Sequence, residues 1–185
     1  MSELHYRAAD AQDQAKVYIA AILAALGPRD PMDVLREMPS RLRETLAGLS
    51  PAQLAAPEAP GKWSMSQVVQ HLADSDLVGA FRFRMVLAQD RPVLSGYDQD
   101  RWIERVHRND ADTEVALTEF VTLRRANVRL LEKTTPEERN RVGLHAERGE
   151  ESLGSMIPLY AGHDIVHLRQ LDRIRQVVAP PGAAE

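Results

Sequence analysis

The segment WSMSQVVQHLADS, residues 63–75, carries the strongest structural signal in this chain of 185 residues. Ser64 is followed three residues later by Gln67, which is the capping-box pattern found at the first turn of helices. Trp63, directly before the cap, can pack against Val68 as a hydrophobic staple. We therefore predict that a helix begins at Ser64.

Proline, glycine and further capping residues divide the rest of the chain into four more helical segments. Asp30-Pro31, for example, is an N-cap residue followed by proline at the first helical position. We expect Pro39 to kink or restart the segment that follows. The predicted helices span residues 10–26, 30–49, 64–89, 112–133 and 152–178. Few phenylalanines and much alanine, leucine and arginine also favour helices over sheets.

The predicted fold is all-α, a four-helix bundle with an extra N-terminal helix packed outside it. Four long helices joined by connections of different lengths suit that architecture. The expected division is an N-terminal helical extension over residues 1–29, the bundle over residues 30–179 and a mobile tail over residues 180–185. Between the helices, residues 50–62 are expected to form a loop and residues 90–109 a long irregular connection, while residues 141–151 show no periodic pattern.

Composition excludes several classes of function. The chain has no cysteine, which excludes disulfides, a thiol nucleophile and cysteine-based metal sites. Its formal net charge of −4, without a basic block, argues against a nucleic-acid partner. The most apolar run, Val17–Leu26, is about half of the ~20 residues that span a bilayer, and no basic segment precedes it as in a signal peptide. We therefore expect a cytoplasmic protein that binds neither nucleic acid nor membranes.

Without cysteine, a metal site has to use nitrogen and oxygen donors, so the six histidines are the first candidates. His163 and His167 are four residues apart on a predicted helix, which places both rings on one face. His71, two turns into the helix that begins at Ser64, is expected to face inward among apolar neighbours. Facing bundle helices lie ~8–10 Å apart, within reach of imidazoles from both sides. These three histidines are therefore predicted to bind one divalent metal and to leave a position open for water or substrate.

Each histidine also has a plainer interpretation. Surface histidines often fall four residues apart by chance, and a single inward histidine is commonly a core residue bonded to a backbone carbonyl. The string HDIVH, residues 163–167, is similar to the HExxH pattern of zinc proteases, but no further histidine follows it to act as the third ligand. His5, His107 and His145 are expected to lie outside the site, with His145 exposed unless its charged loop folds across the mouth of the bundle.

Several motifs together resemble the DinB-like superfamily, and most closely its YfiT-type branch of metal-dependent hydrolases. They are Trp63-Ser64, the run His71 to Ser75, Tyr97-Asp98 with Trp102, and the run Leu159 to His167. The resemblance covers about residues 30–174. It implies a four-helix bundle, a homodimer, and a three-histidine site for a divalent metal, often nickel or zinc. By position, the resemblance assigns the ligands to His71, His163 and His167. The superfamily also includes S-transferases that use low-molecular-weight thiols such as bacillithiol or mycothiol.

The predicted function is that of a metal-dependent enzyme acting on a small-molecule substrate. The metal would activate either a low-molecular-weight thiol, in an S-transferase, or water, in a hydrolase. The alternative is a non-enzymatic dimeric helical bundle that binds a ligand or serves in a stress response, with a structural metal or none. No cysteine is present, so in the transferase reading the reactive sulfur has to come with the substrate.

Three residues near the predicted ligands are candidates for catalytic or positioning roles. Asp74, one turn after His71, can orient that ring through its second nitrogen, or it can be an exposed aspartate, which is the commoner case. Asp164 can act as a base or as a partner of a metal ligand, or it can form an exposed pair with Arg169. Tyr160 can line the pocket, or it can be a core aromatic residue.

Two further groups have possible contacts with a substrate. Arg82 and Arg84 flank Phe83 and can meet an anionic substrate, although such arginines more often lie on the solvated surface. The long connection with Tyr97, Asp98 and Trp102 can form a lid, or Trp102 can anchor it against the bundle.

Overall fold

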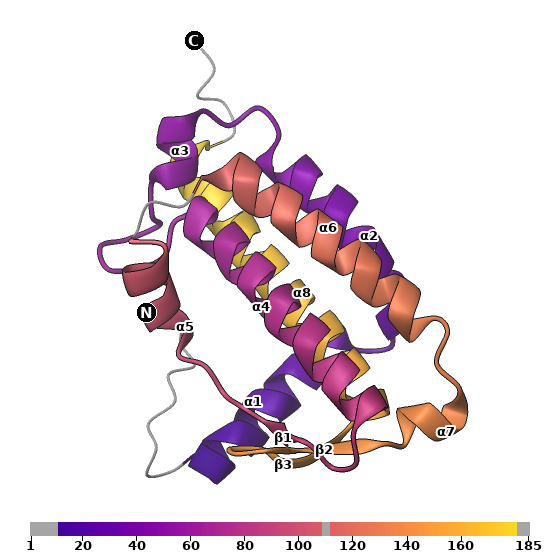
Figure 1. The fold of residues 1–185 in the computed structure, drawn as a ribbon. Coiled ribbons are helices and arrows are strands. Elements are labelled where there is room, and N and C mark those ends of the chain that lie inside the picture. Colours follow the sequence, from indigo (N-terminus) through magenta and orange to yellow (C-terminus); the bar gives the residue numbers. More distant parts are fainter. Residues whose placement is uncertain (1–10, 109–111, 181–185) are drawn as a thin grey trace.

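The computed structural model describes residues 11–108 and 112–180, which form a bundle of four long helices (Figure 1). These helices are α2 (Pro31–Leu46), α4 (Met65–Ala88), α6 (Thr113–Leu131) and α8 (Leu153–Val178). α4 packs against α6 and α8, and α2 packs against the same two helices. The prediction of an all-α four-helix bundle is confirmed. His5 and all but the first residue of the predicted C-terminal tail lie outside the described residues.

α4 begins where the capping pattern predicts. The Ser64 side chain accepts a hydrogen bond from the Gln67 N–H at 3.3 Å, and the Gln67 side chain accepts one from the Ser64 N–H at 2.9 Å. These two bonds satisfy N–H groups that the start of a helix leaves without partners. Trp63 and Val68 are both buried in the same core cluster, as expected for a hydrophobic staple.

α1 (Ala11–Leu26) packs against α8 on the outside of the bundle, as predicted for the N-terminal helix. Gly162 on α8 allows this contact, because a Cβ atom at that position would lie only 2.4 Å from the carbonyl oxygen of Ile22. Any side chain there would push α1 away from α8. The domain boundaries proposed around residues 29 and 179 stay a prediction.

A small sheet at the α1 end of the bundle is the main feature that the sequence did not predict (Figure 1). β1 (Val93–Leu94) pairs in parallel with β2 (Val142–His145), and β2 pairs antiparallel with β3 (Gly149–Ser152). The strands have no more than four residues each, too few for an alternating pattern to stand out. Gly149 has φ +77°, a conformation that glycine adopts without strain, at the turn between β2 and β3.

Short helical turns complete the chain. α3 (Pro51–Ala55) lies in the segment expected to be a loop, because Ser50 and Gln53 form another capping box. α5 (Gln99–Arg101) and η2 (Trp102–Val106), a π-helical turn, lie in the connection expected to be irregular, and α7 (Pro136–Arg139) follows Thr135 as predicted. Among the described helices, none combines the length and apolar character that crossing a membrane requires.

α2 continues through Pro39 rather than restarting there. Proline has no N–H, so the carbonyl of Leu35, four residues earlier, lacks its usual helical partner. The Arg124 side chain of α6 donates to that carbonyl at 3.4 Å. A buried arginine thus supplies the hydrogen bond that the proline removes.

The guanidinium of Arg124 also binds two buried carboxylates and so contacts all four bundle helices. Its Nε and Nη2 donate to Asp76 of α4 at 3.0 and 2.7 Å, and its Nη1 and Nη2 donate to Asp164 of α8. The three residues are at most 3% exposed. Burial alone would lower the pKa of Arg124, but the two carboxylates raise it, so the group stays charged.

We predict that Arg124→Met lowers the free energy of unfolding by about 3–5 kcal/mol, because it leaves two buried carboxylates without their cation. Urea denaturation followed by circular dichroism measures the loss. Arg125→Met is the matched control, since Arg125 is the exposed neighbour on the same helix and its loss should change stability by less than about 0.5 kcal/mol. Equal stability of the two variants would contradict the prediction.

Candidate metal centre

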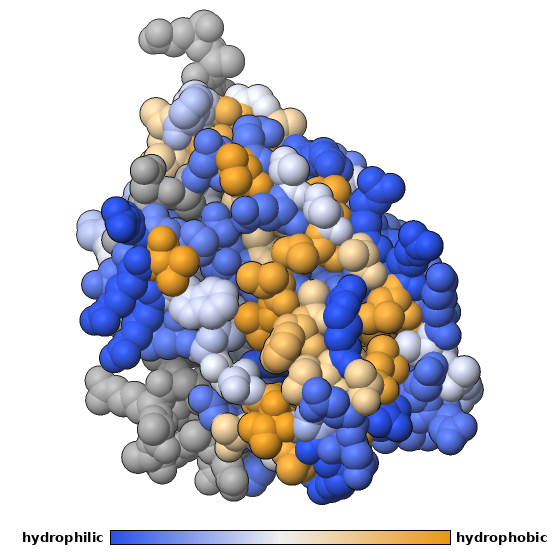
Figure 2. Space-filling view, in the orientation of Figure 1, coloured by the Kyte–Doolittle hydropathy of each residue, from blue (hydrophilic) through white to orange (hydrophobic). Residues whose placement is uncertain are grey.

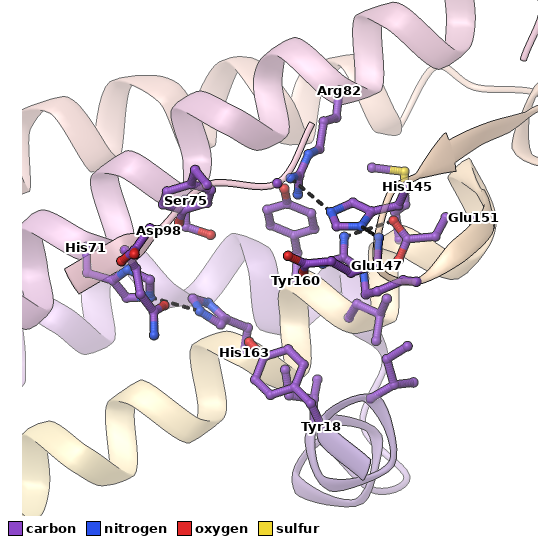
Figure 3. Close-up of a pocket in the computed structure, with 18 of the residues that line it drawn as sticks. Tyr18, His71, Ser75, Arg82, Asp98, His145, Glu147, Glu151, Tyr160 and His163 are labelled. Atoms are coloured by element: carbon purple, nitrogen blue, oxygen red, sulfur yellow. Dashed lines mark hydrogen bonds and ion pairs between the residues drawn. The ribbon is translucent and has the colours of Figure 1, made fainter. Parts of the chain in front are cut away.

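The structure brings His71, His163 and His167 together between α4 and α8. The Nε2 atom of His163 lies 3.1 Å from that of His71 and 3.1 Å from that of His167. One nitrogen from each ring lies within 4.8 Å of the others. Figure 3 shows the His71 and His163 rings facing each other at one end of a pocket. The spacing of four on α8 and the inward position on α4 therefore produce the expected cluster.

The three rings are in the protonation state that binds metals. His71 and His167 are buried, and His163 is partly exposed toward the pocket. Burial lowers the pKa of His71 and His163 well below its usual value, and it lowers the pKa of His167 to about 4. All three imidazoles are therefore neutral near pH 7, and each has a lone pair available for a metal.

Gln170 determines which nitrogen of His167 faces the cluster. Nδ1 of His167 lies 2.8 Å from Oε1 of Gln170. Because an amide oxygen only accepts, Nδ1 is the donor, and Nε2 presents its lone pair to the other two rings. Histidines that bind metals usually donate the N–H of their other ring nitrogen to such an acceptor, which fixes the orientation of the ring. Gln170 was missed in the sequence, although its position three residues after His167 places it on the same face.

The donor set fits a divalent cation. Three neutral nitrogens converge without a charged partner among the described side chains around them, and desolvated lone pairs in contact need a shared donor or a cation. Two nitrogens that each lie ~2.0–2.1 Å from one tetrahedral ion stand roughly 3.3 Å apart, close to the observed 3.1 Å. His71, His163 and His167 could therefore hold one ion with small adjustments, and the pocket side would remain open.

Asp74 neither bonds to His71 nor lies exposed, so neither of its two interpretations is correct. Its carboxylate accepts a hydrogen bond from Nε2 of His107 at 2.9 Å and is also close to Gln70, at 3.5 Å. Burial raises the pKa of Asp74, while His107 opposes that rise. Side chains three residues apart on a helix point in different directions by about a sixth of a turn, and Asp74 is thereby turned to the segment after η2. His107 thus ties this segment to α4.

Asp164 is neither exposed nor paired with Arg169. It is 1% exposed, and both of its oxygens accept hydrogen bonds from Arg124. Burial raises the pKa of Asp164 to about 6 although Arg124 opposes this. Arg169 instead reaches the carbonyl of Ala25. Asp164 therefore holds α8 in place, and its carboxylate is already occupied by Arg124.

A pocket of about 740 Å³ opens beside the histidine cluster. Its walls come from α1, α4, the connection around α5, the β2–β3 hairpin and α8. Lining residues include Tyr18, Ile22, His71, Arg82, Tyr97, Asp98, His145, Glu147, Glu151, Tyr160 and His163. Tyr160 thus lines the pocket, as one of its two interpretations predicted. The connection with Tyr97 and Asp98 covers one side, and Trp102 packs against Tyr97 with ring centroids 4.6 Å apart.

The hairpin contributes a wall that the sequence did not predict. His145 was expected to be exposed, but it is 3% exposed, because alternate residues of β2 point inward. Its loop folds against the end of the bundle, which was the other arrangement considered. Arg148 and Glu151 form a bidentate pair at 2.5 and 2.9 Å beside it. This wall could not be predicted because it depends on the pairing of β2 with β1, a strand that is distant in the sequence.

Comparisons with known proteins agree with this fold. A curated relative from Oceanobacillus iheyensis is 30% identical over 137 residues, which are 74% of this chain and 79% of the relative, and one from Bacillus mycoides is 28% identical over 142 residues, or 77% and 82%. Both are named "Putative metal-dependent hydrolase". The solved structure of YfiT from Bacillus subtilis, described as "a probable metal-dependent hydrolase with an unusual four-helix bundle topology", matches with a TM-score of 0.73 and 25% identity, over 93% of this chain and 91% of that one. The family model of the DinB superfamily matches residues 35–171, and the chain therefore belongs to the DinB superfamily.

Proposed function

We propose that this protein is a metal-dependent hydrolase whose ion is held by His71, His163 and His167. The observation that carries the proposal is the convergence of three neutral Nε2 atoms at the wall of a pocket large enough for a small molecule. The names of the relatives support the same reaction class. A three-nitrogen site that is open on one side is typical of catalytic rather than structural zinc.

A bound divalent ion would supply Lewis acidity that lowers the pKa of water or of a thiol toward neutrality. The chain's own residues would hold this ion and orient the rings that bind it. His71 and His163 present nitrogens directly to the pocket, and Gln170 fixes the His167 ring. Burial raises the pKa of Tyr160, so its hydroxyl stays protonated and can donate a hydrogen bond to a substrate oxygen.

Thiol S-transfer is the second candidate for the same site. The pocket has room for a nucleophile larger than water, and the chain has no cysteine of its own that could serve as the sulfur nucleophile. In that reaction the sulfur would belong to a low-molecular-weight co-substrate. A dimeric ligand-binding or stress-response protein without catalysis, with a structural metal or none, remains the non-enzymatic alternative.

The homodimer, the cytoplasmic location and the choice of nickel or zinc stay predictions, as does the lack of nucleic-acid and membrane partners. One feature of the surface supports the homodimer. Figure 2 shows apolar side chains gathered over the face formed by the bundle helices near its centre. On α4, Leu77 and Phe81 are 51% and 62% exposed and lie one turn apart.

We predict about one divalent metal per chain in the untagged protein, measured by elemental analysis after loading and dialysis. His71→Ala, His163→Ala and His167→Ala should each lose it, because two imidazoles bind a divalent ion far more weakly than three. His107→Gln is the control. His107 lies outside the cluster, so this variant should keep the metal. Retention of the metal after all three alanine changes would refute the site.

Gln170→Leu should weaken metal binding about 10- to 100-fold without abolishing it, because the His167 ring loses the hydrogen bond that holds its Nδ1 proton. Competition with a coloured chelator measures the affinity. Gln170→Glu is the informative second variant, since a carboxylate still accepts from Nδ1 and should restore most of the binding. Equal affinity of wild type and Gln170→Leu would show that Gln170 does not position the ring.

Metal-loaded protein should turn over at least one member of a panel of amides and esters, and His163→Ala should reduce that rate by at least about 100-fold. A parallel panel pairs low-molecular-weight thiols with electrophiles and reports S-transfer. Turnover in the second panel alone would assign the transferase reaction. No turnover in either panel, with the metal bound and the fold intact, would favour the non-enzymatic alternative.

A further inference from the structure

The pocket has a second polar group, built from Arg82, His145 and Tyr160. Arg82 comes from α4, His145 from β2 and Tyr160 from α8, and all three line the same pocket as His71 and His163. Nη2 of Arg82 lies 3.2 Å from Nε2 of His145. Figure 3 shows the Tyr160 hydroxyl beside the Arg82 guanidinium, with this group set apart from the His71–His163 pair.

Arg82 is a buried cation that lacks an anion. It is 6% exposed, and no carboxylate of the described residues forms an ion pair with it. Its hydrogen bonds go to neutral acceptors, the carbonyl of Ser95, the His145 ring and the Tyr160 hydroxyl. Its Nε is buried without any hydrogen-bond partner. Since buried charges in proteins are usually paired, this guanidinium is suited to an anionic ligand.

His145 is also short of an acceptor. Burial lowers its pKa to about 4, with Arg148 and Arg82 contributing, so the ring is neutral near pH 7. A neutral imidazole accepts at only one nitrogen. Two donors face this ring, the Glu147 N–H at Nδ1, 3.2 Å away, and Nη2 of Arg82 at Nε2. The ring N–H and the donor that faces it therefore both lack an acceptor in this contact, whichever nitrogen carries the proton.

Tyr160 adds a third donor, and the bundle holds its ring in place. A Cβ atom at Gly79 of α4 would lie 2.7 Å from the Tyr160 ring, so only glycine leaves room for the ring there. Phe83 packs on the other part of the ring, with centroids 5.0 Å apart. The neighbouring Arg82 opposes the rise in the pKa of Tyr160 that burial causes, as expected for a hydroxyl oxygen beside a cation.

The pocket is lined by five acidic side chains and three arginines, and this excess of negative charge disfavours a doubly charged ligand. Arg148 and Glu151 neutralise each other through their bidentate pair. The carboxylate of Glu147 lines the same pocket and would repel a doubly charged group. A carboxylate has one negative charge and about four acceptor positions, which match the N–H and O–H groups of Arg82, His145 and Tyr160.

We propose that Arg82, His145 and Tyr160 form a subsite for the carboxylate of a small organic acid, and that the substrate of this protein carries such a group. The first half concerns binding alone, and the second rests on the proposed function. The carboxylate would lie at the hairpin end of the pocket, and the remainder of the molecule would extend toward His71 and His163.

The test measures binding of propionate, benzoate and phenylacetate, each beside its primary amide, by calorimetry and ligand-observed NMR. The metal-free protein is used first, so that a carboxylate bound to an ion does not count. We expect the acids to bind at least about tenfold more tightly than the amides, because only the acids pair with the guanidinium. Inorganic phosphate should not displace benzoate. Equal affinity for acids and amides would overturn the subsite.

Variants assign the effect to this group of residues. Arg82→Gln should weaken binding of the acids about 10- to 100-fold, and Tyr160→Phe about two- to tenfold. Arg84→Gln is the matched control, because Arg84 lies two residues further along α4, is exposed and donates to the Ala80 carbonyl. Unchanged acid binding in Arg82→Gln overturns the proposal. If Arg82→Gln does not fold, unchanged acid binding in Tyr160→Phe overturns the proposal instead.

The same samples separate this proposal from the metal-dependent function. Metal content and the preference for acids over amides are measured on the same preparations of wild type and Arg82→Gln. Acid binding that depends on Arg82, in a chain that holds no metal, would keep the subsite and refute the metal-dependent function. Metal binding without a preference for acids over amides would do the opposite.

Discussion

The buried guanidinium of Arg124 is the interaction on which the rest of the structure depends. It donates to Asp76 on α4, to Asp164 on α8 and to the Leu35 carbonyl that Pro39 leaves free on α2. Taking these charges out of water is costly, and an apolar replacement of all three could be as stable. The cluster instead contributes specificity for one packing arrangement, because its hydrogen bonds are satisfied in only one arrangement of the four helices.

The same cluster sets the geometry of the candidate metal centre. α4 and α8 carry all three histidines, and Arg124 joins these two helices through Asp76 and Asp164. Asp164 directly follows His163, so a shift of its carboxylate would move that ring as well. The ring nitrogens of the cluster lie 3.1 Å apart, and the buried ion pairs restrain the two helices that carry these rings.

Local signals in the sequence were sufficient for the helices and for the ligand candidates. The Ser64–Gln67 capping box and the spacing of His163 and His167 depend on neighbours within one turn, and both have the expected local geometry. The errors concern long-range contacts. Burial of His145 needs the pairing of β2 with β1, and the role of Asp164 needs Arg124, 40 residues away. Neither partner can be identified from spacing alone.

The two ends of the pocket suit groups of opposite charge, and this asymmetry limits which ligands can bind. At the α4–α8 end, three neutral imidazole nitrogens converge, a donor set that suits a cation. At the hairpin end, Arg82 and His145 present N–H groups and lack an acceptor. A neutral, symmetric ligand would satisfy neither end. A ligand with an anionic group at one end and a polarisable group at the other would satisfy both, and its orientation would follow from charge rather than from shape. The hairpin that closes the pocket would thereby also determine which end of the substrate reaches the histidines.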